Sequence, residues 1–321
     1  MKIFLHSSSY RSGFALVATA VCATLTSSHL AQATAFTNTG SIANTRHNMT
    51  QSTAGVGISN TMDLARNDYG EVCVYCHTPH GSSAAIVAPL WNRTTKATSY
   101  TLYSSNTLTQ TVAQPGGSSL ACLSCHDGQT AIDSIINMPG SGGYNANQAT
   151  TQNTAFLNTW NNPVGRVDTI GHQGLNSRNN IQGDGMGSQG CLVCHSDTGA
   201  LGGATDFTVF LIGTDLRNDH PVGVTFPTTN GPGTGFNTPA ATAGTARFFD
   251  VNGNSRMDKG EVRVYGPGAG GAAAAASATV ECASCHDPHG VPSAGVGSTF
   301  NKTFLRMSNS GSALCLTCHI K

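Results

Sequence analysis

The chain reads Cys282-Ala-Ser-Cys285-His286 near its C-terminal end, and this Cys-x-x-Cys-His pattern occurs five times. In chain order, motifs 1 to 5 are Cys73-Val-Tyr-Cys76-His77, Cys122-Leu-Ser-Cys125-His126, Cys191-Leu-Val-Cys194-His195, Cys282-Ala-Ser-Cys285-His286 and Cys315-Leu-Thr-Cys318-His319. They use every cysteine except Cys22, and a histidine follows each pair. This pattern predicts five covalent haems c, in which both thiols form thioethers and the histidine is the proximal iron ligand.

Other roles for paired cysteines fit this pattern poorly. A structural zinc site needs four ligands from two half-sites, and an odd number of pairs leaves one over. A thioredoxin-type dithiol belongs in a βαβ pattern, which the sequence lacks, and a disulfide framework needs no histidine after each pair.

The first 35 residues are typical of a secretory signal peptide. Lys2 and Arg11 are basic, residues 13–25 are apolar, and small residues suitable for cleavage follow in Ala31-Gln32-Ala33 and Ala33-Thr34-Ala35. The apolar stretch is too short to span a bilayer. We therefore expect an exported protein that is extracellular or at the cell surface, with the periplasm as the alternative.

The number of histidines matches the number of motifs. Twelve are present, of which two lie in the leader and five are proximal ligands. The five that remain are candidate distal ligands: His47, His80, His172, His220 and His289. Iron bound by imidazole on both faces has no vacant position for a substrate, so this count favours electron transfer.

Spacing limits which iron each distal histidine can reach. His80 follows His77 by three residues, and His289 follows His286 in the same way, so neither can reach the far face of its own haem. We expect His80 to serve motif 2 and His289 to serve motif 5. Among the others, we expect His47 to serve motif 1, His172 motif 3, and His220 either motif 4 or a neighbouring subunit.

Composition predicts an irregular fold. Charged residues make up only 10% of the chain, glycine is abundant, and no apolar period of 3.6 residues persists. We expect a loop-rich, haem-stabilised core with short helices and few short strands. Residues 36–138 would carry haems 1 and 2, residues 139–226 an insertion with haem 3, and residues 227–321 the last two haems. Stretches 139–154, 227–246 and 266–278 are typical of linkers.

A second metal site is predicted between motifs 3 and 4. Oxygen ligands occupy positions 1, 3, 5, 9 and 12 of a twelve-residue calcium loop, and the backbone carbonyl of position 7 completes the set: Asp250, Asn252, Asn254, Arg256, Asp258 and Glu261. Ser255 stands where such loops usually have glycine, and the flanks 247–249 and 262–265 read as strands. The alternative is a polar turn rich in Asx residues.

Several runs resemble the doubled-CxxCH multihaem c-type cytochromes, and within them the filament-forming type of outer-membrane cytochrome E. The runs are Arg46-His47-Asn48, His77-Thr-Pro-His80, Pro89-Leu-Trp91-Asn-Arg93, Asn218-Asp-His220-Pro-Val-Gly223 and His286-Asp-Pro-His289. The resemblance implies a head-to-tail homopolymer with stacked haems, in which one axial histidine comes from the adjacent subunit. Motif 3 and His172 have no counterpart in the tetrahaem pattern, so this chain has one extra haem.

The leading hypothesis is therefore a non-enzymatic electron conduit with outer-membrane or periplasmic redox partners and extracellular electron acceptors. A soluble periplasmic pentahaem shuttle is the alternative, although 10% charge leaves little for a charged docking face. A multihaem reductase is less favoured, because no Cys-x-x-Cys-Lys motif occurs. The net charge of zero permits self-association and argues against nucleic-acid binding.

Overall fold

The computed structural model describes residues 36–50, 69, 71–86, 88–93, 99–130, 132–137, 175, 191–193, 195, 206–266 and 278–321. The chain divides into two compact units. The first, residues 1–34 and 53–60, contains none of the described residues, which all belong to the second. The expected signal peptide, His172, Cys194 and the linker 139–154 lie outside the described residues.

The α-helices of the described residues are short, and each contains cysteines of one motif. They are α3 (Gly117–His126), α4 (Cys282–Cys285) and α5 (Ala313–Cys318). Single 3-10 turns form η1 (Ile42–Asn44), η2 (Cys73–Tyr75), η5 (Cys191–Val193), η6 (Thr208–Phe210), η7 (Lys302–Phe304) and η8 (Ser310–Ser312). None of the described helices has the length and apolar character needed to cross a membrane.

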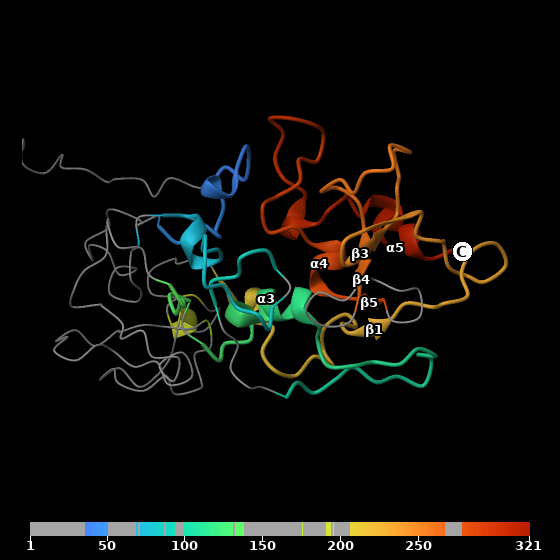
Figure 1. Ribbon diagram of the computed structural model, residues 1–321, viewed down its shortest axis with the longest axis horizontal. Helices are drawn as coiled ribbons and strands as arrows, with labels where there is room; N and C mark the ends of the chain where they lie inside the picture. The colour runs from blue at the N-terminus through green and yellow to red at the C-terminus, as the bar shows by residue number, and fades with distance from the viewer. Residues whose placement is uncertain are drawn as a thin grey trace, which may run out of the picture. The chain divides into compact units, whose positions relative to one another are not determined.

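One antiparallel sheet lies beside α4 and α5 (Figure 1). Its strand order is β1-β5-β4-β3-β2, with bounds β1 Val224–Thr225, β2 Ala241–Ala243, β3 Ala246–Phe248, β4 Arg263–Tyr265 and β5 Thr279–Val280. Strands β3 and β4 fall where the flanks of the calcium loop predicted strands, and that prediction is confirmed. The loop therefore joins two neighbouring strands rather than two helices.

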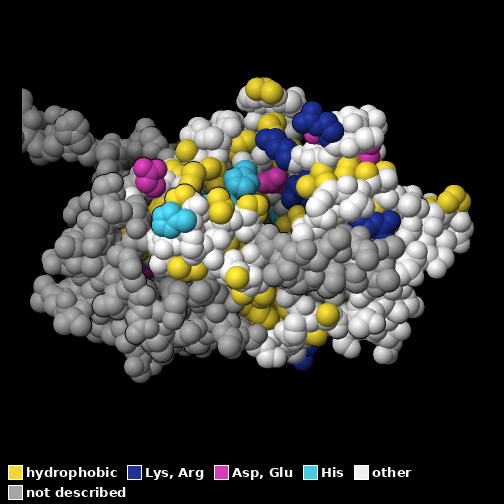
Figure 2. All heavy atoms as spheres, viewed as in Figure 1, with side chains coloured by type: hydrophobic (Ala, Val, Ile, Leu, Met, Phe, Trp, Pro, Cys, Tyr) yellow, Lys and Arg dark blue, Asp and Glu magenta, His cyan; other side chains and the backbone are white. Residues whose placement is uncertain are grey.

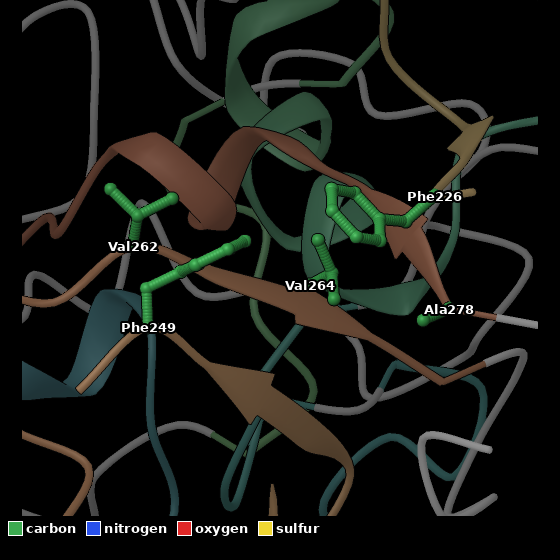
Figure 3. Packing of buried hydrophobic residues seen from close by; sticks show 5 residues of the cluster. All are labelled: Phe226, Phe249, Val262, Val264 and Ala278. Atoms are coloured by element: carbon green, nitrogen blue, oxygen red, sulfur yellow. The ribbon is translucent and has the colours of Figure 1, made fainter. Parts of the chain in front are cut away.

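The sheet carries the main hydrophobic core. Figure 3 shows its five buried members, Phe226, Phe249, Val262, Val264 and Ala278. Met307, Leu314 and Cys318 pack against this cluster from the C-terminal segment, so the core also fixes motif 5. Burying one Val or Phe side chain stabilises a fold by about 1.5–3 kcal/mol. The loop-rich, haem-stabilised architecture itself stays a prediction.

The stretch 227–246 differs from the linker that its composition predicted. It contains β2, and its Phe236 ring packs edge-on against Phe226 of the core, 6.0 Å between ring centres. Phe236 also pairs with His319 through an isolated β-bridge. Strand β2 and the Phe236 ring therefore hold this segment against the sheet, despite its content of glycine and proline.

Candidate functional site

The cysteine motifs share one local geometry. In four of them, the backbone N–H of the histidine donates to the carbonyl of the first cysteine, at 2.8–3.0 Å: His77 to Cys73, His195 to Cys191, His286 to Cys282 and His319 to Cys315. In motif 2, the whole Cys-x-x-Cys-His sequence lies in α3. Residues three and four apart share one face of a helix. Motifs 1, 2, 4 and 5 thus present their cysteines and histidine on one side, as haem attachment requires.

Thiols of different motifs approach one another. Burial, and to a lesser extent the Cys125 thiol, raise the pKa of Cys76 to about 12. Interaction with the Cys282 thiol, followed by burial, raises the pKa of Cys122. Burial raises the pKa of Cys318 to about 12, and the Cys285 thiol adds to the increase.

These contacts give the motifs an order in space. Motif 1 adjoins motif 2, motif 2 adjoins motif 4, and motif 4 adjoins motif 5. Helices α3 and α4, which carry motifs 2 and 4, also pack together (Figure 1). The spatial series 1–2–4–5 therefore bypasses motif 3.

Three proximal histidines each face a second histidine ring. The ring centres of His77 and His289 lie 6.1 Å apart with planes at 13°, and His220 and His286 repeat both values. His47 and His126 lie 6.2 Å apart with planes at 86°. Two metal–imidazole bonds of about 2.0–2.1 Å and about 1.1 Å from each nitrogen to its ring centre give about 6.3 Å. The pairs therefore fit an iron bound on both faces.

Hydrogen bonds orient these rings for metal binding. The proximal rings donate from Nδ1 to backbone carbonyls at 2.7 Å: His77 to Pro89, His126 to Phe210 and His286 to Thr303. A carbonyl only accepts, so Nδ1 carries the proton and Nε2 keeps its lone pair for a metal. Among the distal rings, His47 Nδ1 donates to the Pro288 carbonyl at 3.2 Å.

The ring of His289 is held by a carboxylate. Its Nδ1 lies 3.1 Å from Asp287 Oδ1, and Arg306 Nη1 lies 3.2 Å from Asp287 Oδ2. The hydrogen bond from His289 and the charge of Arg306 lower the pKa of Asp287, although burial acts to raise it. Gly290 closes the same turn at φ +83°, where a Cβ atom would collide with the Phe300 ring. A carboxylate on Nδ1 makes an axial imidazole a more basic ligand.

The pairing differs from the expected one at motifs 1, 2 and 5. His47 faces motif 2, which we expected His80 to serve, and His289 faces motif 1 rather than motif 5. The cause is a long-range contact between the segment 36–50 and the C-terminal region. Thr39 pairs with Thr299, and the Phe300 N–H donates to the Asn38 carbonyl at 2.7 Å. His220 faces motif 4, as expected.

His80 and His319 are both exposed, and they belong to opposite ends of the motif series. The His80 carbonyl accepts a hydrogen bond from Asn137 Nδ2 at 2.9 Å. The His319 ring lies against Phe236, 5.0 Å between centres. On the face shown in Figure 2, histidine side chains reach the surface beside hydrophobic ones.

The loop 250–261 folds as a series of turns around its acidic residues. Asp250 accepts from the N–H groups of Asn254 and Ser255, and Glu261 accepts from those of Val251 and Asp258. Ser255 has φ 58°, the left-handed conformation that glycine usually supplies at this position. Among the described residues, no three His, Cys, Asp or Glu side chains gather as a metal cluster.

Sequence reasoning missed the residues that support the histidines. Trp91 packs edge-on against His77, 5.7 Å between centres, and its buried Nε1 has no hydrogen-bond partner within the described residues. Arg93 is fully buried and donates to the Ser124 and Ile132 carbonyls at 2.7 Å, which ties motif 2 to the preceding loop. The signal was the run Pro89-Leu-Trp91-Asn-Arg93, which drew attention only as part of the family resemblance.

Comparison with known proteins supports the haem interpretation. The family model described as the doubled CXXCH motif matches residues 274–321, which contain motifs 4 and 5. No curated protein sequence matches the chain. The motifs imply covalently bound haem c, and the match suggests an electron-transfer protein rather than an enzyme. The C-terminal segment thus carries the doubled CXXCH motif of multihaem c-type cytochromes.

Proposed function

We propose that this chain is an exported electron conduit that holds five haems between paired imidazoles and polymerises head to tail into an extracellular filament. The three opposed histidine pairs, with ring centres 6.1–6.2 Å apart, carry the proposal. Bound haem supplies reversible one-electron chemistry. The chain sets the spacing, the axial ligands and the local dielectric. Because both faces of each iron are taken, no position is left for a substrate.

The number of histidines supports the polymer. His47, His220 and His289 face motifs 2, 4 and 1, which leaves two distal candidates for motifs 3 and 5. His172 is the nearer of the two to motif 3 in sequence, although it lies outside the described residues. His80 then remains for motif 5. Motif 1, which His80 follows directly, is at the opposite end of the series from motif 5, so His80 binds the motif 5 haem of a neighbouring copy.

The surfaces near both ends of the series suit such a contact. Leu90, next to motif 1, is 52% exposed, and Leu316 and Ile320 beside motif 5 are 41% and 42% exposed. Contact between copies would remove these apolar side chains from water, which favours association. A net charge of zero adds no repulsion between copies.

We also propose one calcium ion in the loop 250–261. The amide nitrogens of Asn252 and Asn254 both donate to Asp258 Oδ2, at 2.8 and 2.7 Å. A bound cation would take the place of these two amide donors at the Asp258 carboxylate and would supply a full divalent charge. Because the loop joins β3 to β4, the ion would stabilise the sheet that supports motif 5.

The test combines three measurements on protein sheared from the cell surface. Mass spectrometry should give five covalent haems, and carbon monoxide should leave the reduced spectrum unchanged, because every iron is six-coordinate. Electron microscopy should show filaments. Dispersed single particles with five low-spin haems would instead identify the soluble shuttle, and a spectral shift with carbon monoxide would identify an open iron and overturn the conduit.

A further inference from the structure

The segment Phe207–Phe210 connects motif 3 to motif 2. At its first residue, the Phe207 ring stacks on the His195 ring, 4.0 Å between centres and 2° between planes. The Phe207 N–H also donates to the His195 carbonyl at 2.6 Å. The proximal histidine of motif 3 is therefore held by one residue through both its ring and its backbone.

The other end of the same segment holds the proximal histidine of motif 2. The Phe210 carbonyl accepts the hydrogen bond from His126 Nδ1 at 2.7 Å. Ile212 and Gly213 then donate their N–H groups to the His126 carbonyl, at 2.9 and 3.1 Å. Only the turn η6 separates the two contacts, and the Phe207 and Phe210 ring centres lie 6.0 Å apart.

The opposite face of motif 2 approaches the same aromatic residue. The Arg46 guanidinium lies over the Phe207 ring, 5.2 Å from its centre, and the next residue is His47, whose ring faces His126. A cation over an aromatic face is attracted by the ring quadrupole. Phe207 thus touches the histidine of motif 3 and lies next to residues from both axial sides of motif 2.

We infer that the haem of motif 3 exchanges single electrons with the haem of motif 2 through the segment Phe207–Phe210. Motif 2 already adjoins motifs 1 and 4 in the series 1–2–4–5. Motif 3 gives it a third neighbour, so the conduit forks at motif 2. In each transfer, one of the two haems would be oxidised by one electron and the other reduced by the same electron, with no bond made or broken. This inference rests on the proposed function, because it requires haem at both motifs.

The fork can be tested with the paired substitution Cys191→Ala and Cys194→Ala, which removes the haem of motif 3. Low-spin ferric haem with perpendicular imidazoles gives a strongly anisotropic electron paramagnetic resonance signal, and near-parallel imidazoles give a rhombic one. Among the three described pairs only His47–His126 is near perpendicular, so the anisotropic signal that His47→Ala removes labels motif 2. Loss of motif 3 should shift the midpoint of the anisotropic signal and slow its spin relaxation, while the rhombic signals of motifs 1 and 4 stay unchanged. An unchanged anisotropic signal beside altered rhombic signals overturns the fork.

A second variant keeps every thioether. Phe207→Leu should retain five haems and still shift the anisotropic signal, because it removes the stack on His195 and loosens the turn that holds His126. The matched control is Val209→Ala, since Val209 lies in the same turn but is 77% exposed. If Phe207→Leu leaves the midpoint of the anisotropic signal unchanged, the fork is contradicted but the proposed function is not. A wild-type protein that lacks this signal, or lacks five haems, counts against the proposed function instead.

Discussion

The imidazole rings of His47 and His126 lie 6.2 Å apart with their planes at 86°, whereas the His77–His289 and His220–His286 pairs are within 13° of parallel. The difference has a local cause. His47 Nδ1 is directed to the Pro288 carbonyl, and the Phe304 ring packs against it at 4.5 Å between centres. His126 Nδ1 is directed to the Phe210 carbonyl. The two hydrogen bonds hold the two rings at a right angle.

Substitution of His47 should remove one class of low-spin signal. We expect wild-type protein to show at least one strongly anisotropic ferric signal and at least two rhombic ones, and His47→Ala to lose one anisotropic signal and no rhombic one. The measurement is low-temperature electron paramagnetic resonance, with His220→Ala as the control that removes a rhombic signal instead. Loss of a rhombic signal in His47→Ala would show that His47 serves a different motif.

Substitution of His80 should prevent polymerisation without removing haem. We expect His80→Ala to retain five covalent haems, to remain as single protomers in electron microscopy, and to show one iron that binds carbon monoxide. Ser82→Ala, in the same loop, should still form filaments with closed irons. Filaments of normal length in His80→Ala would contradict ligation between copies.

Substitution of Asp287 should raise the reduction potential of the motif 1 haem. The carboxylate accepts from His289 Nδ1, which makes that imidazole more basic and stabilises ferric iron. If Asp287→Asn weakens this interaction by about 1 kcal/mol, the one-electron midpoint rises by roughly 40 mV. Spectroelectrochemical titration measures the shift, and the exposed Asp206→Asn is the control. A lower midpoint would mean that His289 is not the ligand.

The local structure of each cysteine motif could be predicted from the sequence, whereas the pairing of histidines far apart in the chain could not. The Cys-x-x-Cys-His spacing is satisfied within one helical turn, so the motifs fold as their sequences indicate. The strands 246–248 and 263–265 could also be predicted, because apolar and aromatic residues flank the loop between them. The partners of His47 and His289 depend instead on contacts such as Thr39 with Thr299, for which neither segment carries a signal of its own.

The sequence predicted haem 3 on an insertion between two haem pairs, but it did not predict which motifs on either side of the insertion meet. The Cys122 and Cys282 thiols interact directly. Glu281 links α3 to α4: it is the N-cap residue of α4, and its carboxylate accepts from the Gly116 N–H at the start of α3. A single acidic residue before Cys282 does not reveal that role in a sequence. In the proposed conduit, this packing of α3 against α4 would let electrons pass from motif 2 to motif 4 without motif 3.

Calcium should raise the thermal stability of the region around motif 5. A ligand at one hundred times its dissociation constant stabilises a fold by about 2.7 kcal/mol, and each kcal/mol shifts the melting temperature by about 2–4 °C at this chain size. We expect added calcium to raise Tm in the wild type and to have no effect on Asp258→Asn. Calorimetry with and without a chelator measures this. Asp206→Asn is again the control, and an equal calcium response in Asp258→Asn would exclude the loop as the site.

The carboxylate of Glu281 lies between motifs 2 and 4 and is almost wholly buried. It accepts from the Gly116 N–H at 3.1 Å, from Ser119 Oγ at 2.5 Å and from Thr279 Oγ1 at 2.7 Å. Ser119 Oγ in turn accepts from the Cys282 N–H at 2.8 Å. Burial raises the pKa of Glu281 despite these donors. The folded protein therefore holds the carboxyl proton more tightly than the unfolded chain does.

Glu281 should thus make stability depend on pH. Its contribution is fully present below the unfolded pKa, near 4.5, and is lost as pH rises through the folded value. Gln at this position does not titrate, so the destabilisation caused by Glu281→Gln should be smaller at pH 7 than at pH 4. Thermal unfolding of both proteins at the two pH values measures the difference. Ser119→Ala is the structural control: it removes a donor, so it should raise the pKa further and enlarge the loss of stability between pH 4 and pH 7.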